Sequence, residues 1–283
     1  RTIAFGGDVL VHTPVAASAA RAGTVAGVPY DFGALLAPLS PVLADVDLAL
    51  CHLEVPLTGP PITGYPLFRA PLEVASGIRA VGYDGCSTAS NHSLDAGRDG
   101  VASTLATLEA AGLGHVGTAR TAEEDVASRI YSIDGVGIGH LSYSYGFNGI
   151  PLPPDAPWAA DLIDPAVIAR DAAATRDAGA DVVVVSLHWG TEYRADPDGF
   201  QVDTARALAA VDDVDLVIGH HAHVVQPVEQ VDGTWVVYGL GNQLSNQQQD
   251  ERRDGLTVVV TVGGPAGERL SVRSVDAVPT WVD

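Results

Sequence analysis

Six of the nine histidines, together with Asp8, Glu54 and Asn91, lie in five short polar clusters, each directly after a run of apolar residues. The candidate ligands in these clusters are Asp8, His52, Glu54, Asn91, His92, His188, His220, His221 and His223. Imidazole nitrogens combined with carboxylate and amide oxygens suit borderline divalent metals such as Mn, Zn, Fe or Co. If the clusters meet in the folded chain, they predict one or two divalent metal ions that activate a water molecule. Each residue also has a purely structural explanation, since a lone buried histidine is commonly a hydrogen-bonded core residue, so the prediction depends on the clusters occurring together.

The apolar runs before these clusters predict buried strands. They cover residues 2–5, 46–50, 83–88, 181–186 and 215–218. Continuous Val/Ile/Leu runs of this length are typical of strands that are covered on both faces. Segments with helical spacing separate them, at residues 72–81, 100–111, 165–178 and 200–211. This alternation favours βαβ units in a largely parallel sheet, whose strand ends would bring the polar clusters together at one edge.

Helix boundaries and a hairpin are also predicted. Asp164 and Pro165 suit the start of a helix, whereas Gly112 and Gly179 suit helix ends. Residues 128–133 and 136–141 flank Asp134-Gly135, which is a hairpin signal. After Val224 the chain becomes rich in strands, and we expect these to join a second sheet, with residues 243–283 as its C-terminal extension. We expect residues 1–283 to form a single domain.

Composition excludes several classes of protein. With 47% hydrophobic and 18% charged residues, the 283-residue chain can bury a sizeable core. The 35 acidic residues outnumber the 15 basic ones, and the net charge of −20 argues against binding to nucleic acid. Every basic residue is Arg, so Schiff-base chemistry and a P-loop are excluded. No apolar run reaches the roughly 20 residues of a membrane-spanning helix.

Two features bear on the cellular location. The chain contains no Met, even at its first residue, so we expect a signal peptide, lipid anchor or flexible leader to precede Arg1. We therefore expect the protein to lie outside the cytoplasm or at the cell surface, with a cytoplasmic location as the alternative. Cys51 and Cys86 each lie near the end of a predicted strand. We expect two buried thiols, with a single disulfide between neighbouring strands as the alternative.

Six motifs in order resemble one known family. They are GGD (6–8), LE (53–54), SNHSLDAG (90–97), HWGTEY (188–193), GHHAHVVQPVE (219–229) and YGLGN (238–242). The chain resembles the poly-γ-glutamate capsule synthesis (CapA-like) family of the calcineurin-like metallophosphoesterase superfamily. The resemblance implies an α/β fold, a four-layer α-β-β-α sandwich of two mixed sheets flanked by helices.

The resemblance also implies roles for individual residues. Asp8 would bind the first metal, Glu54 would bridge two ions, and Asn91 with His188 would bind the second. His221 and His223 would each bind one ion. The implied catalytic residues are His92, as general acid or transition-state stabiliser, and Asp95, as its orienting partner.

This chain departs from the superfamily pattern beside two of these positions. Leu10 stands where the superfamily has a metal-binding His, and His12 is a less certain replacement. His52 occupies a position that is usually Asn in the family, and we leave open whether it binds metal or supports a ligand. His220 is left unassigned.

Candidate substrate contacts surround the predicted metal site. Arg69 and Arg98 suit an anionic group, while Glu192 is either a substrate contact or a solvated carboxylate. In the long loop 143–158, Tyr145 and Asn148, together with Tyr143, Phe147 and Trp158, line a pocket or else pack on one another.

The implied activity is a metal-dependent hydrolase acting on a small anionic or γ-glutamyl/peptide substrate, with an amide as the expected bond. The alternatives are a phosphoester hydrolase, a metal-dependent peptide epimerase, and a non-catalytic protein of capsule assembly or export. The oligomeric state is left open.

Overall fold

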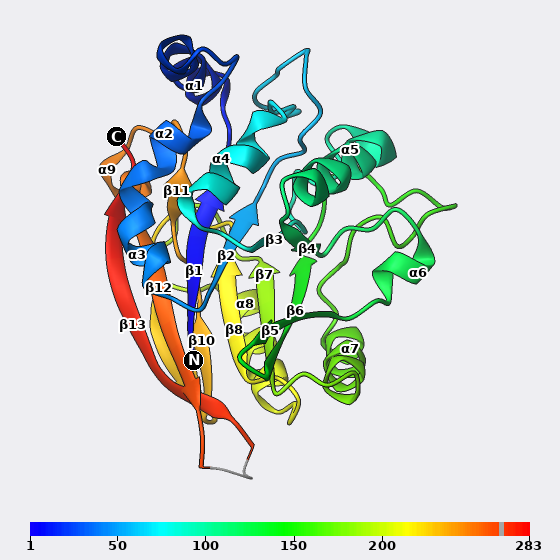
Figure 1. Cartoon of the computed structure of the whole chain (residues 1–283). Helices are drawn as coiled ribbons and strands as arrows, with labels where there is room; N and C mark the ends of the chain where they lie inside the picture. Colours follow the sequence, from blue (N-terminus) through cyan, green and yellow to red (C-terminus); the bar gives the residue numbers. More distant parts are fainter. Residues whose placement is uncertain (266–268) are drawn as a thin grey trace.

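Two mixed β-sheets pack face to face in the computed structural model, which describes residues 1–265 and 269–283 (Figure 1). In the described part, the first sheet has the order β13-β12-β1-β2-β3-β4, with β11 paired to β1 beyond the end of β12. Its strands are β1 (Thr2–Val9), β2 (Leu48–Leu53), β3 (Gly85–Ser87), β4 (Gly114–Val116), β11 (Asn242–Leu244), β12 (Asp254–Gly263) and β13 (Ser271–Trp281). The run from β1 to β4 is parallel, whereas β12 and β13 are antiparallel.

The second sheet has the order β5-β6-β7-β8-β10-β9. Its strands are β5 (Arg129–Ile133), β6 (Val136–Ser144), β7 (Val182–His188), β8 (Leu216–His220), β9 (Val228–Val231) and β10 (Thr234–Val237). The predicted hairpin at Asp134-Gly135 is confirmed as the antiparallel pair β5–β6. Strands β6, β7 and β8 are parallel to one another.

Helices cover the outer face of each sheet. The helices of the described residues are α1 (Thr13–Ala26), α2 (Phe32–Leu36), the 3₁₀ helix η1 (Ala37–Leu39), α3 (Ser40–Ala44), α4 (Glu73–Val81), α5 (Gly97–Ala110), α6 (Ala122–Asp125), α7 (Pro165–Asp177), α8 (Gly199–Ala209) and α9 (Asp250–Arg253). Figure 1 shows α2, α3 and α4 in front of the sheet that contains β1, with β13 along its outer edge. The predicted four-layer α-β-β-α sandwich is confirmed.

The valine run of β7 illustrates why the buried strands are apolar on both faces. Val182 and Val184 point between the two sheets, where they pack in a core with Phe5 and Leu50. Val183 and Val185 point the other way, into the core under α7 and α8. A strand covered on both sides needs apolar residues at every position.

The five predicted core strands are divided between the sheets rather than gathered in one. β1, β2 and β3 lie in the first sheet, and β7 and β8 lie in the second. The prediction that residues 243–283 extend the second sheet is also wrong, since the described strands in that range, β11, β12 and β13, belong to the first sheet. β11 and β12 both pair with β1, which would otherwise leave a buried strand with an open edge.

Cys51 and Cys86 form a disulfide, so the prediction of two free thiols is wrong. They are opposite one another on the adjacent parallel strands β2 and β3. Among the described residues, none of the helices combines the length and the apolar composition needed to cross a bilayer.

Candidate metal centre

Asp8 reaches the site through an irregularity in β1. The pairing of β1 with β2 shifts register between Phe5 and Asp8, where Gly6 and Gly7 interrupt the strand. At Gly7 a side chain would collide with the backbone carbonyl of Gly241, so the close approach of β1 to the segment before β11 requires glycine. A bulge of this kind redirects the following side chain, and the Asp8 carboxylate is completely buried.

His52 and Glu54 come from the end of β2 and the residue just beyond it. One ring nitrogen of His52 shares a 2.8 Å hydrogen bond with Ser87 Oγ of the adjacent β3, and the other shares a 2.9 Å bond with His188 Nδ1. These two bonds orient the His52 ring. Glu54 is buried beside it, with 1% of its surface exposed.

The turn after β3 contributes Asn91, His92 and Asp95. Asn91 Oδ1 lies 3.0 Å from Nε2 of His188. His92 Nδ1 lies 2.7 Å from Asp95 Oδ2, which also accepts the backbone N–H of Phe68. The Phe68 ring packs edge-on against His92, with centroids 4.6 Å apart, so the imidazole is oriented from two sides.

The second sheet contributes four histidines. His188 and His220 are the last residues of β7 and β8 and are paired in register. His221 and His223 follow in a tight loop with φ angles of 85° and 54°, a left-handed conformation that is costly for residues other than glycine. Strained backbone of this kind occurs most often at functional sites.

The side chains from the two sheets meet in overlapping groups whose ligand atoms lie within 4.8 Å of one another. The groups are Asp8/His52/His220, Asp8/Glu54/His223, Glu54/His188/His221 and Glu192/His221/His223. His220 Nδ1 lies 3.3 Å from Asp8 Oδ1, and His223 Nδ1 lies 3.1 Å from Asp8 Oδ2. Asp8 and Glu54 each belong to two groups, as expected of carboxylates between two cations.

Glu54 provides the test of whether these residues fit a metal. Both of its carboxylate oxygens are buried, and neither accepts a hydrogen bond from any described residue. Asp8 Oδ1, His220 Nδ1 and His221 Nδ1 are also buried without a hydrogen-bond partner in the described chain. Buried carboxylates normally have donors or cations beside them, so this donor set fits a divalent metal ion.

The electrostatics of the site reflect its buried carboxylates. Burial raises the pKa of Glu54 to about 7, and the charge of Asp8 adds to this rise. Burial alone would lower the pKa of His223, but Glu54 and Asp8 outweigh it and raise that pKa to about 9. Burial depresses the pKa of His188 and His52 well below the usual range, so both rings are neutral and suited to bind a cation.

Two candidate residues lie apart from these groups. His12 belongs to none of them, and its Nδ1 accepts the backbone N–H of Asn246 instead. Arg98 is exposed and pairs with Asp155 at 2.8 Å. Arg69 is half-buried, and it follows Phe68, the residue that packs on His92.

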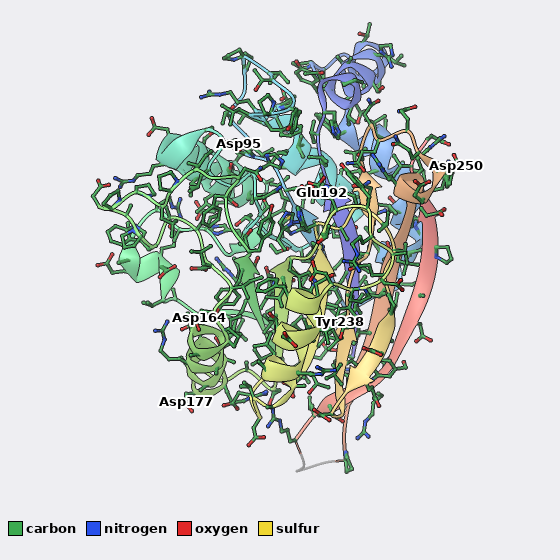
Figure 2. The ribbon with its side chains drawn as sticks, turned by 180° about the vertical axis from the view of Figure 1, so that it is seen from behind. Asp95, Asp164, Asp177, Glu192, Tyr238 and Asp250 are labelled. Carbon is green, nitrogen blue, oxygen red and sulfur yellow. A yellow bond between two sulfur atoms is a disulfide. The ribbon has the colours of Figure 1, made fainter. Side chains whose placement is uncertain are left out.

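The loop 143–158 is divided between the two roles left open above. Tyr145 places its ring 4.7 Å from that of His221, and Asn148 Oδ1 accepts a 3.4 Å hydrogen bond from Asn91. Phe147 and Trp158 instead pack with α5, and Tyr143 points into the core under α7. Glu192 is exposed beside His221 and His223, and Figure 2 places it at the same end of the molecule as Asp95.

Three contributors to the site were not assigned from the sequence. His220 faces Asp8, Ser87 orients His52, and Asn242 Oδ1 lies 2.9 Å from His223 Nδ1. Asn242 ends the YGLGN motif, so its position was a signal that could have been used. The pairing of His220 with Asp8 spans the two sheets and has no local signal.

The fold and the donor set together define a class of protein. The solved structure of the calcineurin-like phosphoesterase YfkN from Bacillus subtilis is similar with a TM-score of 0.57 and 14% sequence identity, covering 99% of this chain and 90% of that one. The chain therefore has the fold of calcineurin-like metallophosphoesterases, with a candidate metal site at the strand ends. The family model described as "Bacterial capsule synthesis protein PGA_cap" matches residues 2–247, and the chain belongs to this family.

Two curated relatives agree with this assignment. The PGA biosynthesis protein CapA of Bacillus subtilis (strain 168) is 38% identical over 97 residues, which are 34% of this chain and 25% of that protein. The capsule biosynthesis protein CapA of Bacillus anthracis is 26% identical over 190 residues, 66% of this chain and 46% of that protein. The chain thus spans between a quarter and about half of the length of these relatives.

Proposed function

We propose that this chain is a metal-dependent hydrolase that acts on a γ-glutamyl-type amide. The observation that carries the proposal is Glu54, a buried carboxylate that accepts no hydrogen bond from the described residues and lies where histidines from both sheets meet. One ion would be held by Asp8, His52 and His220, and the other by Glu54, His188 and His221, with Asn91 and His223 completing the set. His52 and His220 would then compensate for the superfamily histidine that Leu10 replaces.

The bound ions would polarise the scissile bond and lower the pKa of a water molecule to near neutrality. The chain's own residues would do the rest. His92, oriented by Asp95 through Nδ1, is positioned to give a proton to the leaving group through Nε2. Tyr145 and Asn148 would contact the substrate from one side and Glu192 from another, with Arg69 as the nearest candidate for an anionic group.

The relatives support the amide over other bonds, because one of them is described by its role in PGA biosynthesis. A phosphoester is the second candidate, and the fold shared with a calcineurin-like phosphoesterase favours it. The net charge of −20 favours a small substrate held in a local pocket over a long polyanion. The disulfide supports an extracytoplasmic location, where such bonds persist.

The proposal is tested by screening the Mn²⁺-, Zn²⁺- and Co²⁺-loaded protein on γ-glutamyl p-nitroanilide and p-nitrophenyl phosphate. We expect amide cleavage that His221→Ala and Glu54→Gln abolish and that Glu123→Gln, a matched change at an exposed position, retains. Cleavage of the phosphate ester alone would show that the substrate bond is a phosphoester and not an amide. Equal turnover in all variants would refute the proposal, and deuterium incorporation without cleavage would indicate epimerisation instead.

A further inference from the structure

A cavity of about 320 Å³ lies at the edge of the second sheet, bounded by β4, β6, α7 and the segment from α6 to the start of β5. None of the proposed metal ligands lines it. Its volume is at the lower end of the range of roughly 300–1,000 Å³ that is typical of small-molecule sites. The cavity is therefore large enough for a small organic molecule and is separate from the candidate metal centre.

The cavity exists because β6 extends further than its neighbour β5. The pairing of the two strands stops at Arg129 and His140, the first residue of β5 and its partner. Further along β6, the edge is next bonded at Ser144, whose N–H donates to the carbonyl of Asp161 at 2.8 Å. The notch between these two points is lined by β6 residues and is closed from outside by α7.

Two buried polar side chains line this cavity, and each has one polar atom without a hydrogen-bond partner in the described chain. His140 is fully buried, and its Nε2 bonds to Ser186 Oγ at 2.9 Å, but its Nδ1 has no partner among the described residues. Ser142 Oγ, on a residue 2% exposed, is also without a partner there. Burial lowers the pKa of His140 to about 3, so the ring is neutral and does not repel a cation. Buried polar atoms of this kind normally have a partner.

The charged groups around the cavity are mainly acidic. Asp171 is already neutralised, because Arg170 pairs with it at 2.9 Å and the Tyr143 hydroxyl donates to it. Asp125 and Asp161 lie against each other instead, and within residues 1–265 and 269–283 neither forms an ion pair with an arginine. Burial raises the pKa of Asp161 well above its usual range, and the nearby Asp125 raises it further. Two adjacent carboxyl groups need either a shared proton or a cation between them.

We propose that this cavity binds a small organic cation whose primary ammonium group is held by Asp125 and Asp161, with His140 and Ser142 as partners for its polar atoms. An ammonium group satisfies both carboxylates at once through charge-assisted hydrogen bonds. A metal ion fits less well, since the described groups close enough to share one include neither Asp125 nor Asp161. The proposal goes beyond the hydrolase function and does not depend on it.

The test is calorimetric titration of the full chain with n-butylammonium, with 1-butanol as the uncharged match of the same length. We expect saturable binding of n-butylammonium that Asp161→Asn weakens by about tenfold or more. Asp177→Asn removes the same charge at the exposed end of α7 and should leave the affinity unchanged (Figure 2). Circular dichroism establishes that each variant is folded. If Asp161→Asn does not fold, Asp125→Asn, which removes the other carboxylate at an exposed position, takes its place and should also weaken binding.

Three results would overturn the proposal. Equal binding of 1-butanol would make the cavity a simple apolar site. If Asp161→Asn and Asp177→Asn weaken binding equally, the attraction comes from the overall charge of −20 and not from this cavity. Binding of Mg²⁺ but not of n-butylammonium, lost in Asp161→Asn, would identify a metal site. Glu54→Gln should leave the binding of n-butylammonium intact, so failure of the hydrolase proposal would not affect this one.

Discussion

His220, from the second sheet, contacts two residues of the first sheet. Its ring stacks on that of His52, with centroids 4.1 Å apart, and its Nδ1 faces Asp8. We predict that His220→Ala weakens divalent metal binding by about 10- to 100-fold, the range found when residues that support or form metal sites are lost. His12→Ala should leave the affinity unchanged, because His12 is bonded to the backbone of Asn246. Competition with a chromogenic chelator measures the metal affinity of both variants. A lower affinity in His12→Ala together with an unchanged affinity in His220→Ala would contradict this assignment.

At the residue scale, the sequence was informative where the residues of a site lie within a few positions of one another. His221 and His223 flank a single alanine, and the spacing alone indicates that both belong to one loop. His52 and His220 could not be assigned, because their roles depend on a contact between strands of different sheets. The same limit applies to Arg98, whose partner Asp155 lies in a loop that sequence patterns do not place.

At the scale of elements, helix α7 begins at the residue predicted from its Asp164-Pro165 start signal. The Asp164 side chain accepts the N–H groups of Ala166 and Val167. We predict that Asp164→Ala lowers the free energy of unfolding by about 1 kcal/mol, the usual cost of losing a helix N-cap. Asp177→Ala at the other end of α7 removes a negative charge from a helix C-terminus, so urea unfolding should show no loss of stability there. Equal losses in both variants would contradict the capping role.

The disulfide joins two elements whose ends carry His52 and Ser87. It closes a chain segment with a sequence separation of 35 residues between the neighbouring strands β2 and β3. We predict that the double variant Cys51→Ala/Cys86→Ala loses about 3–4 kcal/mol of unfolding free energy, from the chain entropy regained by the unfolded state. Reduction of the wild type should lower its urea midpoint in the same way and leave the double variant unaffected. A midpoint unchanged by reductant would show that the bond is absent or without effect.

Strands and helices were predictable where burial determines every residue, as in the valines of β7. Helix α1 was not predicted, although Pro14 in its first turn is a start signal, because most of its apolar residues are small alanines that occur on its buried and exposed sides alike. The sheet to which β12 belongs was predicted wrongly for a different reason. A strand's own residues show that it is buried, but its partner β1 is more than 200 residues away, and nothing local identifies it.

At the scale of the whole molecule, the net charge of −20 places carboxylates close to one another, and the half-buried Asp161 beside Asp125 is one case. Burial is the larger cause of the raised pKa of Asp161, and the nearby Asp125 adds to it. Because the folded chain raises the pKa of Asp161, the folded state binds this proton more tightly than the unfolded chain, whose carboxyl titrates near 3.8. Stability from this group is therefore complete below pH of about 4 and falls as the pH rises through the folded pKa.

Replacing Asp161 by Asn keeps a neutral side chain at every pH. We predict that Asp161→Asn is more stable than the wild type at neutral pH and that this difference shrinks to nothing towards pH of about 4. Urea unfolding across this range measures the difference. Asp177→Asn provides the control for the loss of one charge, and an Asp161→Asn difference that grows on acidification would contradict the raised pKa.

The whole account depends on whether side chains from both sheets bind metal, and elemental analysis of the purified, dialysed protein measures this directly. The account predicts about one to two equivalents of a divalent transition metal per chain. Wild type and Glu123→Gln should retain this metal, and Glu54→Gln should lose most of it. A chain that holds no stoichiometric metal after loading, or a Glu54→Gln variant that holds as much as the wild type, would contradict it.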